Sequence, residues 1–109
     1  MPENLNSRVF AEQLNTPFRI GVAGREPLVL ELFEVTEGHD SPRLEQFSLM
    51  FRGPMTFMIG QGLYRMNHDK LGELDLFLVP IGPDQKGLRY QVIFNRIRRS
   101  PAPPDQSVT

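Results

Sequence analysis

The sequence predicts an all-β fold: a small six-stranded antiparallel barrel or roll with one short N-terminal helix. Two observations lead to this prediction. Short runs rich in Val, Ile, Leu and Phe are bounded by Gly, Pro, Asn or Asp, and they follow one another at the spacing of sequential antiparallel strands. The chain has 109 residues and no cysteine, so it fits one small domain whose core forms without disulfide bonds.

The first predicted element is the helix, over residues 6–14. Asn6 is a favourable cap, and Val9, Phe10 and Leu14 follow it at roughly helical spacing. We expect Phe10 and Leu14 to anchor this amphipathic helix, which would either plug one end of the barrel or shield an apolar outer face.

The first two strands are predicted over residues 17–22 and 28–37. Gly24 lies in the turn between them and can adopt the positive φ that a tight hairpin requires. Residues 38–43 are polar, and they predict a loop.

The third strand, over residues 45–52, alternates most regularly. Phe47, Leu49 and Phe51 point to one side, and polar or flexible side chains point to the other. This pattern is typical of a strand with one buried face.

The fourth and fifth strands are predicted over residues 62–68 and 73–81. The fifth carries three leucines toward the core: Leu74, Leu76 and Leu78. Its opposite face is apolar as well, because it carries Phe77, Val79 and Ile81. Another part of the structure must cover that second apolar face.

A turn at residues 82–87 leads into the sixth strand, 88–97, with Tyr90, Val92 and Phe94 on one face. The six strands are expected in near-meander order, within a single domain spanning residues 6–97. The Pro-rich tail, 98–109, has almost no apolar side chains and is expected to be disordered.

Three segments of the chain resemble a family of small bacterial domains of unknown function. They are FSLMFRGP (47–54), QGLYRMNHDKLGELDLFLVPIGPD (61–84) and RYQVIFN (89–95). Members of that family pair an FSLLFRGP-like strand with a QGxYxLxHxxLGxxxLFLVPxGP-like hairpin. The resemblance implies a single-domain bacterial protein without an assigned activity, whose relatives accompany phage-tail-collar-like proteins.

The charge balance argues against a general nucleic-acid binder. The formal net charge is −1, whereas binding to phosphates needs a clustered excess of Lys and Arg. Arg96, Arg98 and Arg99 form one locally basic stretch, and single-stranded nucleic-acid binding is therefore a further alternative. No apolar run has the length of a signal sequence or a membrane span, so we expect a cytoplasmic protein without membrane contact.

Catalytic and metal-binding motifs are absent from the sequence. The two histidines, His39 and His68, form no HxH or HxxxH pair, and there is no cysteine. We therefore expect no catalytic residue, no metal and no cofactor. His68 is expected to donate a hydrogen bond that closes the turn before Gly72. The alternative is a small-ligand-binding barrel or enzyme whose mouth is formed by Arg52, Tyr64 and His68.

The most unusual segment is the connection at residues 53–62, which carries four large apolar side chains: Met55, Phe57, Met58 and Ile59. Such a segment either folds over the open end of the barrel or forms a sticky surface. Together with Phe77, Val79 and Ile81, it predicts an interface with a protein partner or a second copy of the chain. We therefore expect a non-catalytic structural or protein-interaction module, either self-associating or accessory to a phage-tail-like or surface assembly.

Overall fold

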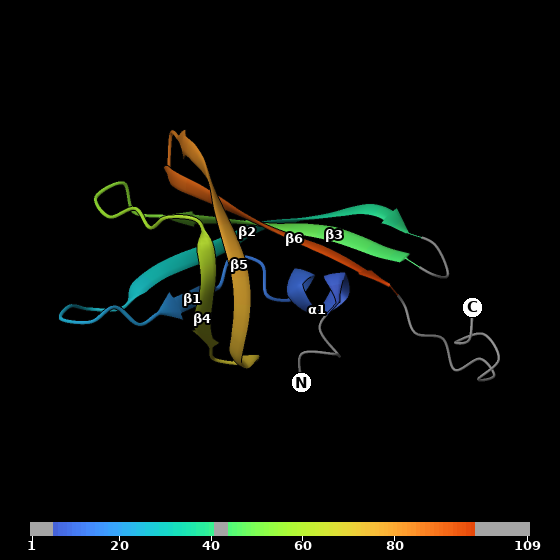
Figure 1. The fold of residues 1–109 in the computed structure, drawn as a ribbon, viewed down its shortest axis with the longest axis horizontal. Helices are drawn as coiled ribbons and strands as arrows, with labels where there is room; N and C mark the ends of the chain where they lie inside the picture. The colour runs from blue at the N-terminus through green and yellow to red at the C-terminus, as the bar shows by residue number, and fades with distance from the viewer. Residues whose placement is uncertain (1–5, 41–43, 98–109) are drawn as a thin grey trace.

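The computed structural model describes residues 6–40 and 44–97, which form six antiparallel strands and one short helix (Figure 1). In chain order the elements are α1 (Ser7–Ala11), β1 (Pro17–Ile20), β2 (Leu28–Asp40), β3 (Leu44–Gly53), β4 (Gly62–His68), β5 (Gly72–Asp84) and β6 (Gly87–Ile97). The predicted mostly antiparallel β architecture with one N-terminal helix is confirmed.

The strands follow one another in a ring in the order β1-β2-β3-β6-β5-β4. β3 pairs with β6 rather than with β4, and β1 closes the ring against β4. The expected near-meander order is therefore wrong at this connection. The physical reason lies in the register of β3 and β6. It sets Phe47 opposite Phe94 and Phe51 opposite Tyr90, so large apolar side chains meet along the pair.

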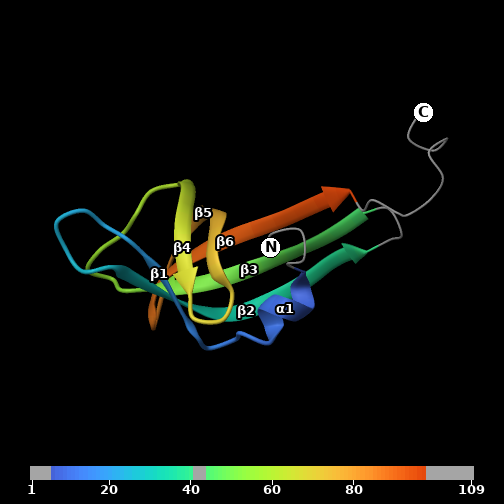
Figure 2. The same ribbon diagram turned by 90° about the horizontal axis from the view of Figure 1, so that it is seen from below.

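Three strands continue beyond the ring. β5 pairs with β6 only from Val79 to Asp84, and β1 pairs with β2 only through Pro17–Ile20. β2, β3 and β6 therefore run on side by side as a three-stranded extension, at the right of Figure 1 and Figure 2. The extension gives α1 a surface to pack against, outside the ring itself.

The strand boundaries differ from the predicted ones at three turns: β1 ends at Ile20, two residues before the predicted end, and two other strands are longer than predicted. Residues 38–40 were expected in a loop but continue β2, since Asp40 still pairs with Glu45 of β3. Residues 82–84 were expected in a turn but continue β5, where Asp84 pairs with Gly87. In both places pairing with the neighbouring strand outweighs the low strand propensity of Gly, Pro and Asp.

Other predicted features agree with the structure. β4 spans the predicted residues 62–68, and Gly24 has the expected positive φ, 79°. Residues 41–43 of the predicted loop and the predicted tail at 98–109 lie outside the described residues.

Alternate side chains fill the interior of the ring. The strands contribute fifteen of the buried side chains: Phe18, Ile20, Leu28, Leu30, Leu32, Phe47, Leu49, Phe51, Met66, Leu74, Leu76, Leu78, Leu88, Tyr90 and Val92. The predicted inward faces of β3 and β5 are thus confirmed. Since burying one large apolar side chain contributes about 1.5–3 kcal/mol, this alternation is the main source of stability.

The helix is shorter than expected and is anchored by one residue. The Asn6 side chain accepts a hydrogen bond from the Val9 amide at 2.9 Å, which confirms the predicted cap. Phe10 is fully buried, with its ring 6.1 Å from that of Phe47 and 5.6 Å from that of Phe94. Leu14 lies beyond the helix end and is 36% exposed, so its expected role as a second anchor is wrong.

Replacing the anchor should loosen the helix from the extension. Phe10→Ala removes a buried ring and should lower the free energy of unfolding by about 3 kcal/mol, as measured by urea denaturation. The matched variant Leu14→Ala should cost less than about 1 kcal/mol, because that side chain is partly in solvent. Equal losses for the two variants would contradict the assignment of Phe10 as the anchor.

Candidate functional site

An apolar surface lies on the outer face of β4, β5 and β6. Leu63 of β4 is directly opposite Phe77 of β5, and their side chains are 67% and 47% exposed. Val79 follows two residues along β5 and so shares the face of Phe77. Ile93 of β6 is 66% exposed and lies diagonally across from Val79, because Val79 pairs with Gln91.

Ile81 extends this surface along β5. The register between β5 and β6 shifts between Pro80 and Gly82, and the resulting bulge leaves Ile81 unpaired and 42% exposed. We call these residues the outer apolar surface: Leu63, Phe77, Val79, Ile81 and Ile93.

The helix does not cover the outer apolar surface. α1 packs against β2 and β3 through Phe10, which contacts Phe47 and Phe94 from the inner side of the extension. Of the two roles expected for the helix, plugging one end of the barrel or shielding the second apolar face of β5, the second is therefore wrong. The helix lies on the inner side of the extension, the side to which the Phe47 and Phe94 rings point.

Charged residues lie beyond both ends of the apolar part of β5. Asp75 and Glu73 precede Phe77 on the same face, and Arg65 of β4 bonds to both carboxylates. This hydrogen bonding lowers the pKa of Asp75. Two carboxylates share one guanidinium, so this end carries a net negative charge.

The other end of β5 carries positive charge. Arg89 of β6 pairs with Gly82, and its Nε donates to the Gly82 carbonyl at 3.3 Å. Lys86 is exposed in the following turn. The outer face of β5 therefore changes from acidic, through apolar, to basic along its length.

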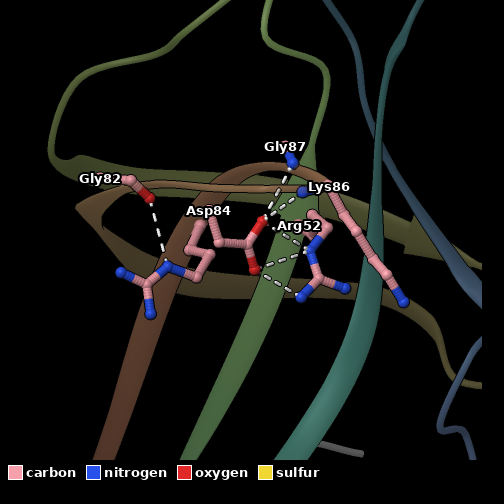
Figure 3. Close-up of polar contacts among 6 residues, drawn as sticks. Arg52, Gly82, Asp84, Lys86 and Gly87 are labelled. Atoms are coloured by element: carbon pink, nitrogen blue, oxygen red, sulfur yellow. Dashed lines mark hydrogen bonds and ion pairs between the residues drawn. The ribbon is translucent and has the colours of Figure 1, made fainter.

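An ion pair holds the turn between β5 and β6 against β3 (Figure 3). The Arg52 guanidinium donates to both carboxylate oxygens of Asp84, with the shortest bond at 2.6 Å. The planar face of the same guanidinium lies over the Phe33 ring, with its Cζ 3.8 Å from the ring centroid. Arg52 thus joins β2, β3 and β5 at one point.

Asp84 also caps the turn itself. Its Oδ1 accepts hydrogen bonds from the amides of Lys86 and Gly87, at 2.8 and 3.0 Å. The Arg52 guanidinium, followed by the Lys86 amide, lowers the pKa of Asp84 to about 2. A Cβ at Gly87 would collide with the Gly53 carbonyl, so glycine permits the close approach of the turn to β3.

The connection between β3 and β4 divides into buried and exposed side chains. Phe57 and Ile59 are partly buried against the core, and Arg25 of the β1–β2 turn lies over the Phe57 ring at 4.1 Å. Met55 and Met58 are 59% and 62% exposed. The segment therefore folds over the ring with one half and faces solvent with the other.

Two tyrosines fasten this connection. The buried Tyr90 accepts a hydrogen bond from the Ile59 amide at 3.2 Å, and Tyr64 donates to the Gly60 carbonyl at 2.7 Å. An otherwise irregular segment is thereby held in one position, because two of its backbone groups have fixed partners.

The residues of the alternative ligand mouth have separate partners. Arg52 binds Asp84 and faces outward, Tyr64 binds the Gly60 carbonyl, and His68 is buried at the far end of β4. Their polar groups thus serve three different local structures.

His68 is a hydrogen-bonding centre inside the fold. Its Nδ1 accepts from the amides of Lys70 and Leu71, at 3.0 and 3.1 Å. The proton therefore lies on Nε2, which donates to the Thr16 hydroxyl at 2.8 Å, and that hydroxyl donates to the Gln13 carbonyl. The ring closes the predicted turn, but as an acceptor rather than the expected donor. Burial lowers the pKa of His68.

A shallow hollow of about 250 Å³ adjoins the outer apolar surface at Ile93. It lies across β2, β3 and β6, and its lining is uncharged: Thr36, Gly38, Gln46, Phe47, Ser48, Gln91, Ile93 and Phe94. These groups can form hydrogen bonds and apolar contacts, but they supply no acid or base.

Within residues 6–40 and 44–97, no group of three or more His, Asp or Glu side chains could hold a metal ion. In the same ranges no helix is long and apolar enough to cross a membrane. The basic stretch that suggested nucleic-acid binding falls outside the described residues, because these exclude Arg98, Arg99 and the side chain of Arg96.

Sequence reasoning missed two residues of the outer apolar surface. Leu63 and Ile93 alternate with inward residues of β4 and β6, so each is an apolar residue at an outward position. This signal was present in the sequence. Their proximity to Phe77 and Val79 required the strand order and register, which the sequence pattern did not supply.

Comparison with known families adds one finding. A family described as a domain of unknown function, DUF6916, matches residues 5–94. The chain belongs to this family. The DUF6916 match agrees with the resemblance to a family of domains without an assigned function. No curated protein and no solved structure matches the chain.

The Arg52–Asp84 ion pair in this DUF6916 domain should make the free energy of unfolding depend on pH in the acidic range. Asp84→Asn keeps an oxygen for the turn amides but loses the charge, so it should lower the free energy of unfolding at neutral pH. The folded-state pKa of about 2 lies below the ordinary 3.8. The wild-type advantage should thus be full above pH 4 and shrink as the pH falls toward 2.

Thermal unfolding of both proteins between pH 7 and pH 2 checks this prediction. Glu73→Gln is the matched control, because Glu73 is 65% exposed in its pair with Arg65 and should contribute little. A gap between wild type and Asp84→Asn that stays constant down to pH 2 would contradict the assignment.

His68 should produce a second pH dependence. Its folded-state pKa lies below the ordinary 6.5, so the unfolded chain takes up the proton first. Stability should be full above pH 6.5 and fall below it. His68→Asn should lower the melting temperature at pH 7.5 and flatten its slope between pH 7.5 and pH 5. His39→Gln is the control, and if it flattens the slope equally, His68 is not the cause.

Proposed function

We propose that this DUF6916 domain is a non-catalytic protein-interaction module that docks through its outer apolar surface. One observation carries the proposal. Leu63 and Phe77 are strongly exposed apolar side chains that the strand register places directly opposite each other, and the exposed Ile93 lies diagonally from Val79, the next outward residue of β5. Scattered exposed apolar residues are ordinary, whereas a contiguous apolar patch is typical of an interaction site.

The energetic argument favours a protein as the partner. Covering apolar surface contributes about 25 cal/mol per Å², so side chains such as Leu63 and Ile93, about two-thirds exposed, each offer on the order of 2 kcal/mol to a partner. An apolar centre with a charged rim is the usual composition of a protein interface. Arg65 and Asp75 on one side and Arg89 on the other form such a rim.

The role of the polar side chains supports a non-catalytic function. Catalysis needs polar groups that converge on a substrate. In this domain Arg52, Asp84 and His68 bond to the domain's own strands and turns. The hydrogen bonds of these three side chains therefore stabilise the ring.

Two surfaces named from the sequence have different parts in this proposal. Phe77, Val79 and Ile81 belong to the docking surface. Met55 and Met58 lie on the fastened connection between β3 and β4, where they can add contacts with a large partner. A phage-tail-like or surface assembly remains one proposed setting for such a module.

Site-specific photocrosslinking tests the proposal. Benzoylphenylalanine introduced at Phe77, with irradiation in producing cells, should give a discrete adduct whose second component, identified by mass spectrometry, is a protein. Val29 is the control position, because it is also 47% exposed and lies on β2, away from the docking surface. If position 77 yields no more adduct than position 29, the docking function is wrong.

A further inference from the structure

We infer that the outer face of β5 docks onto β5 of a second copy of the chain, antiparallel and about a twofold axis. This inference rests on the proposed function and names its partner. It depends on the order of side-chain types along the outer face of β5. This face is acidic at Glu73 and Asp75, apolar from Phe77 to Ile81, and basic beside Gly82, where Arg89 lies.

A twofold axis makes this order self-complementary. In an antiparallel arrangement centred on Val79, Phe77 of one copy lies against the partner's Ile81. Asp75 lies four residues before Val79, about 13 Å along a strand, and Gly82 lies three residues after it, just past the bulge. The acidic end of one copy therefore meets the partner's Arg89, which pairs with Gly82.

Charge selects this arrangement over the alternative one. A parallel arrangement would bring Glu73 and Asp75 of the two copies together, and like charges at an interface are strongly unfavourable. Antiparallel docking gives each acidic end a guanidinium, and it does so twice because of the symmetry. The formal net charge of −1 adds little general repulsion between the copies.

The geometry also accounts for the lateral members of the surface. Leu63 lies beside Phe77, and Ile93 lies diagonally from Val79 on the opposite side of β5. The apolar surface is thereby widened across β4 and β6. An apolar patch on the order of 400 Å² would supply the centre of an interface of about 800 Å² per partner, the size usual for a stable dimer.

Sedimentation equilibrium of the full chain, from about 1 µM to about 1 mM, tests the inference over the range in which weak dimers dissociate. The wild type should approach twice the chain mass of 12.5 kDa. Phe77→Asp should raise the dissociation constant at least about tenfold, because it puts two like charges into the apolar centre. Val29→Asp, at a site of equal exposure, should leave it unchanged.

A charge exchange tests the antiparallel register. Arg89→Glu and Glu73→Lys should each weaken their own dimer, because each sets like charges opposite one another. Mixed in equal amounts, the two variants should restore a dimer, since every acidic end then meets a basic one. Circular dichroism confirms that each variant is folded.

The possible outcomes separate the inference from the proposed function. A wild type that stays monomeric throughout, or a dimer unaffected by both Phe77→Asp and Arg89→Glu, overturns the second-copy inference. Dissociation by both variants without restoration on mixing overturns the antiparallel register. In each case the crosslink at position 77 still decides whether this surface docks another protein.

Discussion

The alternation of β5 is the constraint on which the other features depend. Leu74, Leu76 and Leu78 fill the ring from one side of the strand, so Phe77 and Val79 must point outward. Shifting the strand by one residue would exchange the two sets without removing either. Because both faces are apolar and the ring encloses only one, the fold leaves an apolar surface outside. That surface, rather than a cavity, is therefore the candidate site.

The polar network keeps the outer surface in a fixed shape. Arg52 and Asp84 hold the β5–β6 turn against β3, while His68 ties the β4–β5 turn to the segment before β1. Both ends of β5 are thus attached to other parts of the fold. A surface that is already ordered loses little conformational entropy on docking, which suits an interaction module. The same polar residues that could suggest chemistry in the sequence are those that make the scaffold rigid.

Much of the fold could be predicted because alternation is a local property. The inward residues of β3 and β5, the bounds of β4 and the cap at Asn6 all follow from neighbouring residues. The pairing of β3 with β6 could not be predicted, because it depends on a match between residues far apart in the chain. The length of β5 was missed for a related reason: Asp84 looks like a turn residue until Arg52 binds it. The direction of the His68 hydrogen bonds likewise required the positions of two amides and of Thr16.

The central claim is that the outer apolar surface is open on a single chain and is covered by another molecule. Solvent exposure of Phe77 and Ile93, measured by NMR with a soluble paramagnetic probe, tests it most directly. The account predicts strong broadening of both side chains in dilute samples and protection once a partner or a second copy is bound. Protection of both side chains in a sample that sedimentation shows to be monomeric, with no partner present, would show that the chain covers this surface itself and would contradict the account.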